Sequence, residues 1–153
     1  MLKTLIKILQ PIRRLYWRIF QPTTQGVRAI LVNHNGQILL VRHSYQDGWY
    51  LPGGQVHKKE AYESALRREL EEELGVSEIT HMEKLGEYAN TYEYKKDTIV
   101  VFIVSFFAQQ EKAHFEIEKF SLFDPQSLPD STSPGTRRRV EEWLKKKPVS
   151  NQW

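Results

Sequence analysis

The chain has 153 residues, of which 40% are hydrophobic and 27% are charged, and its net charge at neutral pH is +3. This composition is typical of one globular domain and excludes an intrinsically disordered chain. Cysteine is absent, which excludes a disulfide framework, a thiolate zinc site and a cysteine nucleophile, and which suits a cytoplasmic location. No apolar run reaches the roughly 18 residues that a membrane-spanning helix needs.

Residues 1–22 form a basic, amphipathic N-terminal segment that contains no acidic residue. Lys7 and Pro11 interrupt the apolar stretch that a secretory signal would require. Three interpretations stay open for this segment. It is a helical arm packed on the domain or on a second subunit, an amphipathic segment through which residues 1–20 contact an anionic membrane surface, or an organelle presequence or frayed end.

A hairpin signal comes next in the chain. Two β-rich runs, VRAILV at 27–32 and QILLVR at 37–42, are separated by a segment that ends in Asn35-Gly36. Asn-Gly between such runs predicts a β-hairpin. The following segment is predicted to be rich in turns, because it contains Asp47-Gly48 and then Pro52-Gly53-Gly54.

A helix is predicted from about Glu60 to Leu74, where no Gly or Pro intervenes, with Gly75 placed to end it in a left-handed conformation. Three strands and a last helix are then predicted at 85–94, 98–108, 116–123 and 133–146, with a turn at Lys95-Lys96-Asp97. The strand at 98–108 is apolar almost throughout, as a central strand covered on both faces would be. Ser133-Pro134 is typical of a helix N-cap followed by proline in the first turn.

This order of strands, helix, strands and helix predicts an α/β or α+β domain in which a sheet lies between helices. The domain is expected to occupy residues 23–147, with a short C-terminal tail at 148–153.

The helix at 60–74 carries an unusual density of like charge. At about 100° per residue, its apolar stripe consists of Tyr62, Leu66, Leu70 and Leu74. The neighbouring sector holds three carboxylates among small residues: Glu69, Glu72, Glu73, Ala61 and Ala65. Such carboxylates repel one another unless a cation joins them, and a hard cation such as Mg²⁺ prefers carboxylate oxygens. The alternative is a solvated face with Arg–Glu pairs at i, i+4 spacing.

The residues around this helix resemble the Nudix box. The box is Gly, five residues, Glu, seven residues, Arg-Glu, an aliphatic, any residue, Glu-Glu, any residue, Gly and an aliphatic. The sequence matches it at every position with Gly54, Glu60, Arg68-Glu69-Leu70, Glu72-Glu73 and Gly75-Val76. The resemblance implies a Nudix fold, an α+β sandwich with a mixed sheet between helices and a loop–helix–loop catalytic box.

The resemblance also implies hydrolysis of a nucleoside diphosphate linked to another group, with Mg²⁺ or Mn²⁺ as cofactor. Glu72 and Glu73 would be metal ligands, and Glu69 a further ligand or the general base. Arg68 would orient one of these glutamates and Glu60 would brace the loop, while a carbonyl at Gly53 or Gly54 would complete the metal shell. Many relatives are dimers, so a homodimer is one expectation.

Outside the box, no motif supports the assignment of site residues. Glu116 or Glu118 is the candidate for one more acidic residue at the site, with a surface role as the alternative. A polar and aromatic pocket for the substrate would draw on His43, Tyr45, Trp49 and Tyr92, and Tyr94 lies close by. His57, inside the box, is expected to be a solvated loop residue.

The basic run at 137–139 and Lys145–Lys147 lie on the last helix without interleaved aromatics, so they are read as a solvated face and nucleic-acid binding is not expected. Two alternatives to a small-molecule pyrophosphohydrolase stay open: a nucleotide-sensing module of the same fold, and hydrolysis of an RNA 5′ end. An isomerase of the isoprenoid-diphosphate type needs a catalytic cysteine, which this chain lacks.

Overall fold

The computed structural model describes residues 19, 23–92, 95–105, 107–109, 117–148 and 150–153. The interpretations placed on the N-terminal segment, on Glu116 and on Tyr94 fall outside these residues, as do the side chains of Tyr92 and Glu118. The elements are β1 (Thr23–Val32), β2 (Ile38–His43), β3 (Gln46–Tyr50), α2 (Tyr62–Leu74), β4 (Val76–Ser77), β5 (His81–Tyr92), β6 (Lys95–Ser105), β7 (Ala108–Gln109), β8 (Ile117–Phe123) and α3 (Pro134–Trp143).

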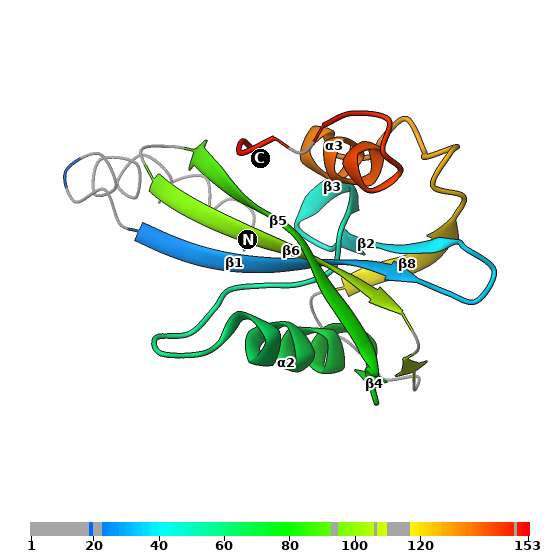
Figure 1. Cartoon of the computed structure of the whole chain (residues 1–153), viewed down its shortest axis with the longest axis horizontal. Coiled ribbons are helices and arrows are strands. Elements are labelled where there is room, and N and C mark those ends of the chain that lie inside the picture. The colour runs from blue at the N-terminus through cyan, green and yellow to red at the C-terminus, as the bar shows by residue number, and fades with distance from the viewer. Residues whose placement is uncertain (1–18, 20–22, 93–94, 106, 110–116, 149) are drawn as a thin grey trace.

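A mixed sheet forms the centre of the molecule (Figure 1). β1 runs parallel to β6, which pairs antiparallel with β5. β2 pairs antiparallel with β8 over its whole length, and its other edge is shared, since β1 pairs with its first residues and β3 with its last. Along this edge of β2, the neighbouring strand therefore changes from β1 to β3.

β2 pairs only with the last residues of β1. The rest of that edge of β1 pairs with the loop between β3 and α2, here called the box loop (residues 51–61). The amides of Val27 and Ala29 donate to the carbonyls of Gly54 and Pro52, each at 2.9 Å, and the Val56 amide donates to the Gln25 carbonyl at 2.9 Å. These bonds satisfy backbone groups of β1 that would otherwise lack partners. They also hold the box loop against the sheet directly before α2 begins.

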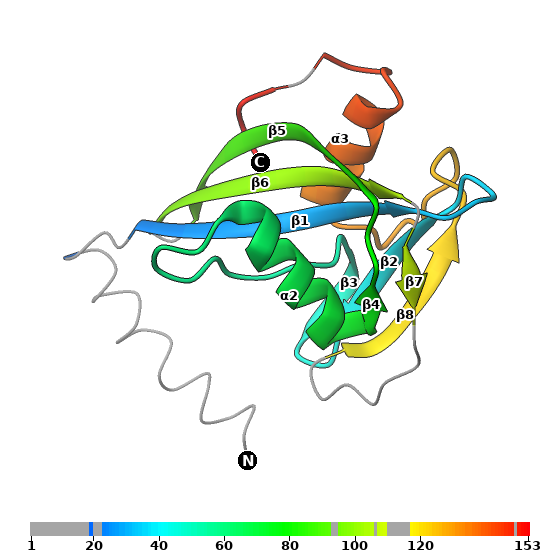
Figure 2. The ribbon, with the colours of Figure 1, turned by 60° about the horizontal axis from the view of Figure 1, so that its bottom comes forward.

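The two helices cover opposite faces of the sheet (Figures 1 and 2). On the α2 face, Leu66, Leu70 and Leu74 are buried against a cluster that includes Val27 and Val41. On the α3 face, a second cluster contains Val140, Trp49 and Ile30 among its members. The predicted sandwich with a sheet between helices is confirmed, and so are the hairpin, the α2 helix with its left-handed Gly75, and the buried strand β6.

Three local predictions differ from the structure. The segment predicted to be rich in turns contains strand β3, which pairs with β2. The turn predicted at Lys95–Asp97 is instead the start of β6, where these residues pair with Tyr92, Thr91 and Asn90. Asp97 also accepts a hydrogen bond of 2.7 Å from the Thr24 hydroxyl, so a contact with β1 holds it in the sheet. The last helix ends at Trp143, a few residues before the predicted end.

The C-terminal tail packs on the domain. The Ala89 amide donates to the Asn151 carbonyl at 2.8 Å, and the Trp153 amide donates to the Ala89 carbonyl at 3.0 Å, so the tail borders β5. Arg139 of α3 is fully buried and donates to the Gln152 carbonyl at 2.7 Å. Neither helix in the described part of the chain is long and apolar enough to cross a bilayer.

Candidate active site

Two glycines allow the box loop to pass between β1 and α2. Gly53 has a φ of +134°, and a β-carbon there would come within 2.2 Å of the Val27 carbonyl oxygen. At Gly54 a β-carbon would come within 2.2 Å of Oε2 of Glu69. A side chain at position 54 would therefore displace the Glu69 carboxylate, which occupies that space.

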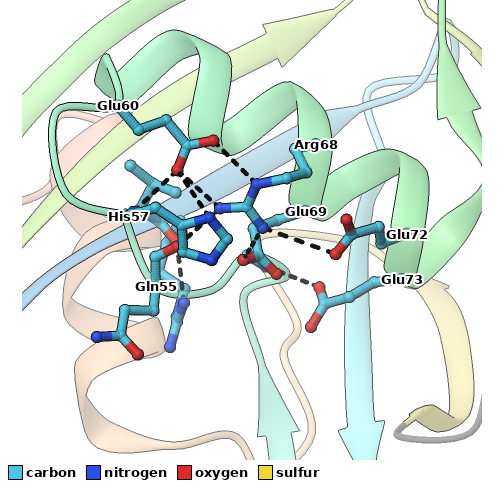
Figure 3. A network of polar contacts seen from close by, with 10 residues as sticks. Gln55, His57, Glu60, Arg68, Glu69, Glu72 and Glu73 are labelled. Atoms are coloured by element: carbon cyan, nitrogen blue, oxygen red, sulfur yellow. Dashed lines mark hydrogen bonds and ion pairs between the residues drawn. The ribbon is translucent and has the colours of Figure 1, made fainter.

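Arg68 links the carboxylates of the site (Figure 3). Its Nε and Nη2 donate to the two oxygens of Glu60 at 2.9 and 2.8 Å, and its Nη1 donates to Oε1 of Glu69 at 2.6 Å. Nη1 also lies 3.6 Å from Oε2 of Glu72. A planar guanidinium suits this task, since it presents several donors in fixed directions.

Glu60 closes the box loop onto the helix. Besides Arg68 it accepts a hydrogen bond of 2.9 Å from the His57 amide. The Arg68 hydrogen bonds, and then the His57 amide, lower the pKa of Glu60 to about 2, so the carboxylate is ionised throughout the physiological range. The hydrogen bonds to Glu60, and then the one to Glu69, raise the pKa of Arg68 above its usual value. The His57 side chain is 67% exposed, as expected for a solvated loop residue.

The three glutamates of the predicted sector lie on the same side of α2. Glu69 is 15% exposed and held by Arg68, whereas Glu72 is 62% exposed. Glu73 accepts a hydrogen bond of 2.9 Å from the Gly53 amide. The apolar stripe on the adjacent side of the helix is buried as predicted, with Tyr62 partly buried at its start.

The donors present suit a hard divalent cation in kind, because Glu69, Glu72 and Glu73 supply carboxylate oxygens from one face of α2. Within the described residues, no three His, Asp or Glu side chains converge at ligating distances. The Gly54 carbonyl is directed at β1, where it accepts from the Val27 amide. That hydrogen bond occupies one lone pair of the Gly54 carbonyl oxygen, and the Gly53 carbonyl is the other donor that the sequence suggested.

A cavity of about 420 Å³ adjoins these groups. Carboxylates and glycines form one part of its lining, and polar and aromatic side chains form the rest: Glu69, Glu73, Gly53, Gly54, Gln55, Arg28, His43, Tyr45, Gln46 and Tyr50. The predicted pocket residues His43 and Tyr45 are among them. The structure thus brings the box and the segment between the hairpin and the box into one site.

Trp49 does not line this cavity, which corrects its assignment as a pocket residue. It is 9% exposed and packs edge-on against Phe123, with ring centroids 4.9 Å apart, in the core on the α3 face. Tyr50, its neighbour, lines the cavity and was missed. Side chains alternate along a strand, so Trp49 and Tyr50 lie on opposite faces of the sheet. Recognising β3 as a strand would therefore have allowed Tyr50 to be assigned to the cavity in place of Trp49. Nothing in the sequence singles out Arg28 or Gln46.

Comparisons with known proteins agree with the fold. The NUDIX domain family model matches residues 22–144. The RNA pyrophosphohydrolase of Ectopseudomonas mendocina (strain ymp) is 46% identical over 53 residues, which is 35% of this chain and 33% of that protein. The match thus spans only about a third of the length of the curated relatives.

Two solved structures are similar over most of their length. The MutT NUDIX hydrolase from Burkholderia pseudomallei has a TM-score of 0.68 and 26% identity, covering 78% of this chain and 96% of that one. The MutT protein from Methanosarcina mazei Go1 has a TM-score of 0.72 and 23% identity, covering 85% and 99% respectively. Since the family model covers most of the chain and the structure has the same fold, the chain belongs to the NUDIX family.

Proposed function

We propose that the chain is a Mg²⁺-dependent pyrophosphohydrolase that cleaves a phosphoanhydride bond in a nucleoside diphosphate linked to another moiety. ADP-ribose, a sugar nucleotide and a dinucleoside polyphosphate are examples of such substrates, and Mn²⁺ is an alternative cofactor. The observation that carries the proposal is the Glu69 carboxylate, which rests on Gly54 and is held by Arg68 at the wall of a cavity.

Glu69, Glu72 and Glu73 are the side chains proposed to hold the cation, with the carbonyl of Gly53 or Gly54 as a further donor. Bound Mg²⁺ would supply positive charge against the oxygens of the diphosphate and favour a nucleophilic water. α2 carries five glutamates and two arginines, and this excess of negative charge is consistent with this assignment.

Glu69 is also the candidate general base. Arg68 occupies its Oε1 at 2.6 Å, which orients the carboxylate while Oε2 lies against Gly54 in the cavity lining. In the proposed reaction a water oxygen forms a new bond to phosphorus as its proton passes to Glu69. The anhydride P–O bond breaks, and the leaving phosphate group keeps the electron pair. Positioning of such a base within hydrogen-bond reach is the first requirement for general base catalysis.

Hydrolysis of an RNA 5′ end is a second candidate, favoured by the partial match to RNA pyrophosphohydrolases. The last helix lends it no support. α3 covers the face of the sheet opposite α2, and its Arg139 is buried rather than free to bind phosphate (Figure 1). A cytoplasmic location, which the absence of cysteine suits, is part of both proposals.

Turnover across a substrate panel tests these proposals. The panel holds ADP-ribose, sugar nucleotides, dinucleoside polyphosphates, nucleoside triphosphates and 5′-triphosphate RNA, each with Mg²⁺, with Mn²⁺ and with a chelator. Cleavage of one small-molecule class that depends on the cation supports the main proposal, and cleavage of RNA alone supports the second. Binding of a nucleotide without cleavage of any substrate would instead indicate a sensing module and overturn both.

A further inference from the structure

Besides its carboxylates, the cavity has a wall of aromatic rings. The His43 ring is stacked on Tyr45, with centroids 5.1 Å apart and planes inclined by 23°. On its other neighbour, Tyr50, the centroids are 5.7 Å apart and the planes are tilted by 48°. The three rings come from the end of β2, the turn after it and the end of β3, and all three line the cavity.

The inner end of this wall is fixed. Tyr50 pairs with Val41 across the β2–β3 ladder and packs against the core on the α2 face. Its hydroxyl donates to the Asp47 carbonyl at 2.7 Å, and burial raises its pKa, so the phenol stays neutral at physiological pH. A rigid aromatic surface of this kind loses little conformational entropy when a flat ligand stacks on it.

The outer end is a tyrosine that is unusually open to solvent. Tyr45 is 64% exposed, even though His43 covers one face of its ring. Three further large apolar side chains are exposed among the described residues: Ile19 at 66%, and Phe120 and Leu122, which are less exposed than Tyr45. None of the three lines the cavity. An exposed aromatic ring beside carboxylates suited to a phosphate-bound cation therefore has the position that the base of a nucleotide would use.

We propose that Tyr45, backed by His43, is the platform on which the nucleobase of the substrate stacks. The inference rests on the proposed function, because it takes the phosphate end of the ligand to lie at the glutamates. It assigns recognition of the base to a π surface rather than to hydrogen bonds, and every base offers a π face. The substrate class is thus one that carries a base on its phosphate chain, with little discrimination between bases.

Binding of AMP and of ribose 5-phosphate, measured by calorimetric titration, separates the base from the rest of the ligand. Native protein is expected to bind AMP more tightly than ribose 5-phosphate. Tyr45→Ala and Tyr45→Leu should weaken AMP binding by roughly 5- to 150-fold, the usual range for loss of one stacked base, and leave ribose 5-phosphate unchanged. Tyr45→Phe, which keeps the ring, should bind AMP as the native protein does.

Leu122→Ala is the matched control, since it removes an exposed apolar side chain away from the cavity. Thermal melting establishes that each variant is folded. The proposal is overturned if Tyr45→Ala binds AMP like the native protein, or if native protein binds the two ligands equally. Because the measurement needs no cleavage, its outcome is separate from that of the substrate panel, and failure of the platform leaves the proposed hydrolysis standing.

Discussion

The Glu69 carboxylate lies directly over the α-carbon of Gly54, where a β-carbon would come within 2.2 Å of Oε2 and 2.3 Å of the carboxyl carbon. The same carboxylate accepts a hydrogen bond of 2.6 Å from Arg68. These two contacts fix the group that we propose as base or metal ligand. A glycine fifteen positions before the glutamate is therefore as much a part of the site as the glutamate itself.

Gly54→Ala is expected to displace the Glu69 carboxylate without unfolding the protein, because the clash is with the end of a side chain. A shift of about 1 Å at a reacting group costs on the order of 100-fold in rate, so kcat for the substrate found with the panel should fall by about that factor. Steady-state kinetics measures it. A native kcat in this variant would show that the position of the Glu69 carboxylate against Gly54 does not matter for turnover.

Gly53→Ala serves as the contrast. Its β-carbon would come within 2.2 Å of a backbone oxygen of β1, at a φ of +134° that side chains disfavour. We expect this variant to lose stability as well as activity, with a lower urea midpoint than Gly54→Ala. Equal urea midpoints for the two variants would contradict the claim that a clash with backbone costs more stability than a clash with the end of a side chain.

Glu60→Gln is expected to destabilise the protein in a pH-dependent way. The pKa of Glu60 falls from an ordinary value of 4.5 to about 2 on folding, so its ion pair stabilises the native state fully above about pH 5. That stabilisation is lost as the pH falls toward 2, because the carboxyl becomes protonated. The difference in urea midpoint between native protein and Glu60→Gln should therefore shrink from pH 7 to pH 3. Exposed Glu63, in the first turn of α2, provides the matched Glu→Gln control.

Thr136 is expected to support the box loop from α3. Its hydroxyl oxygen, fully buried, accepts a hydrogen bond of 3.1 Å from the Leu51 amide and one of 2.9 Å from the Ser133 hydroxyl. Thr136→Val keeps the shape but leaves that amide without an acceptor, which should cost about 1–3 kcal/mol in the free energy of unfolding. Thr136→Ser keeps the hydroxyl and should lose less, and denaturant unfolding of the two variants checks this order.

Arg139 is expected to be the residue that holds the tail on α3. It is fully buried, pairs with Glu142 at 2.9 Å, and has Tyr88 against its guanidinium at 3.8 Å. Arg139→Met leaves the Glu142 carboxylate buried without its cation and should destabilise the protein by about 3–5 kcal/mol. The double variant with Glu142→Gln should regain part of that loss. A native-like unfolding midpoint in Arg139→Met would show that the pair contributes nothing.

Sequence patterns predicted the elements whose causes are local. Asn35-Gly36 specifies the hairpin, and the capping residues Gly75 and Ser133 mark ends of the two helices. The wheel placed Glu69, Glu72 and Glu73 in one sector because a regular helix leaves no other arrangement. Their proximity to one another follows from local geometry alone.

The features that were missed depend on distant partners. β3 is short and contains Asp47-Gly48, which favour a turn. The Trp49 amide nevertheless donates a hydrogen bond of 3.1 Å to the Ser131 carbonyl, and this contact with a distant residue helps to keep the segment extended. Lys95–Asp97 has the composition of a turn, but Asp97 is drawn into β6 by Thr24, which lies 73 positions away. The assignment of Trp49 to the pocket failed for the same reason, since the face a side chain occupies depends on a strand that was not recognised.

The measurement that tests the central claim most directly compares Glu72→Gln with Glu71→Gln in Mg²⁺-dependent cleavage of the substrate found with the panel. Both are exposed glutamates on adjacent positions of α2, and both changes remove one charge. We predict that Glu72→Gln loses about 100-fold or more in kcat while Glu71→Gln retains native turnover. Equal activity of the two variants would contradict the assignment of the glutamate sector as the catalytic metal site.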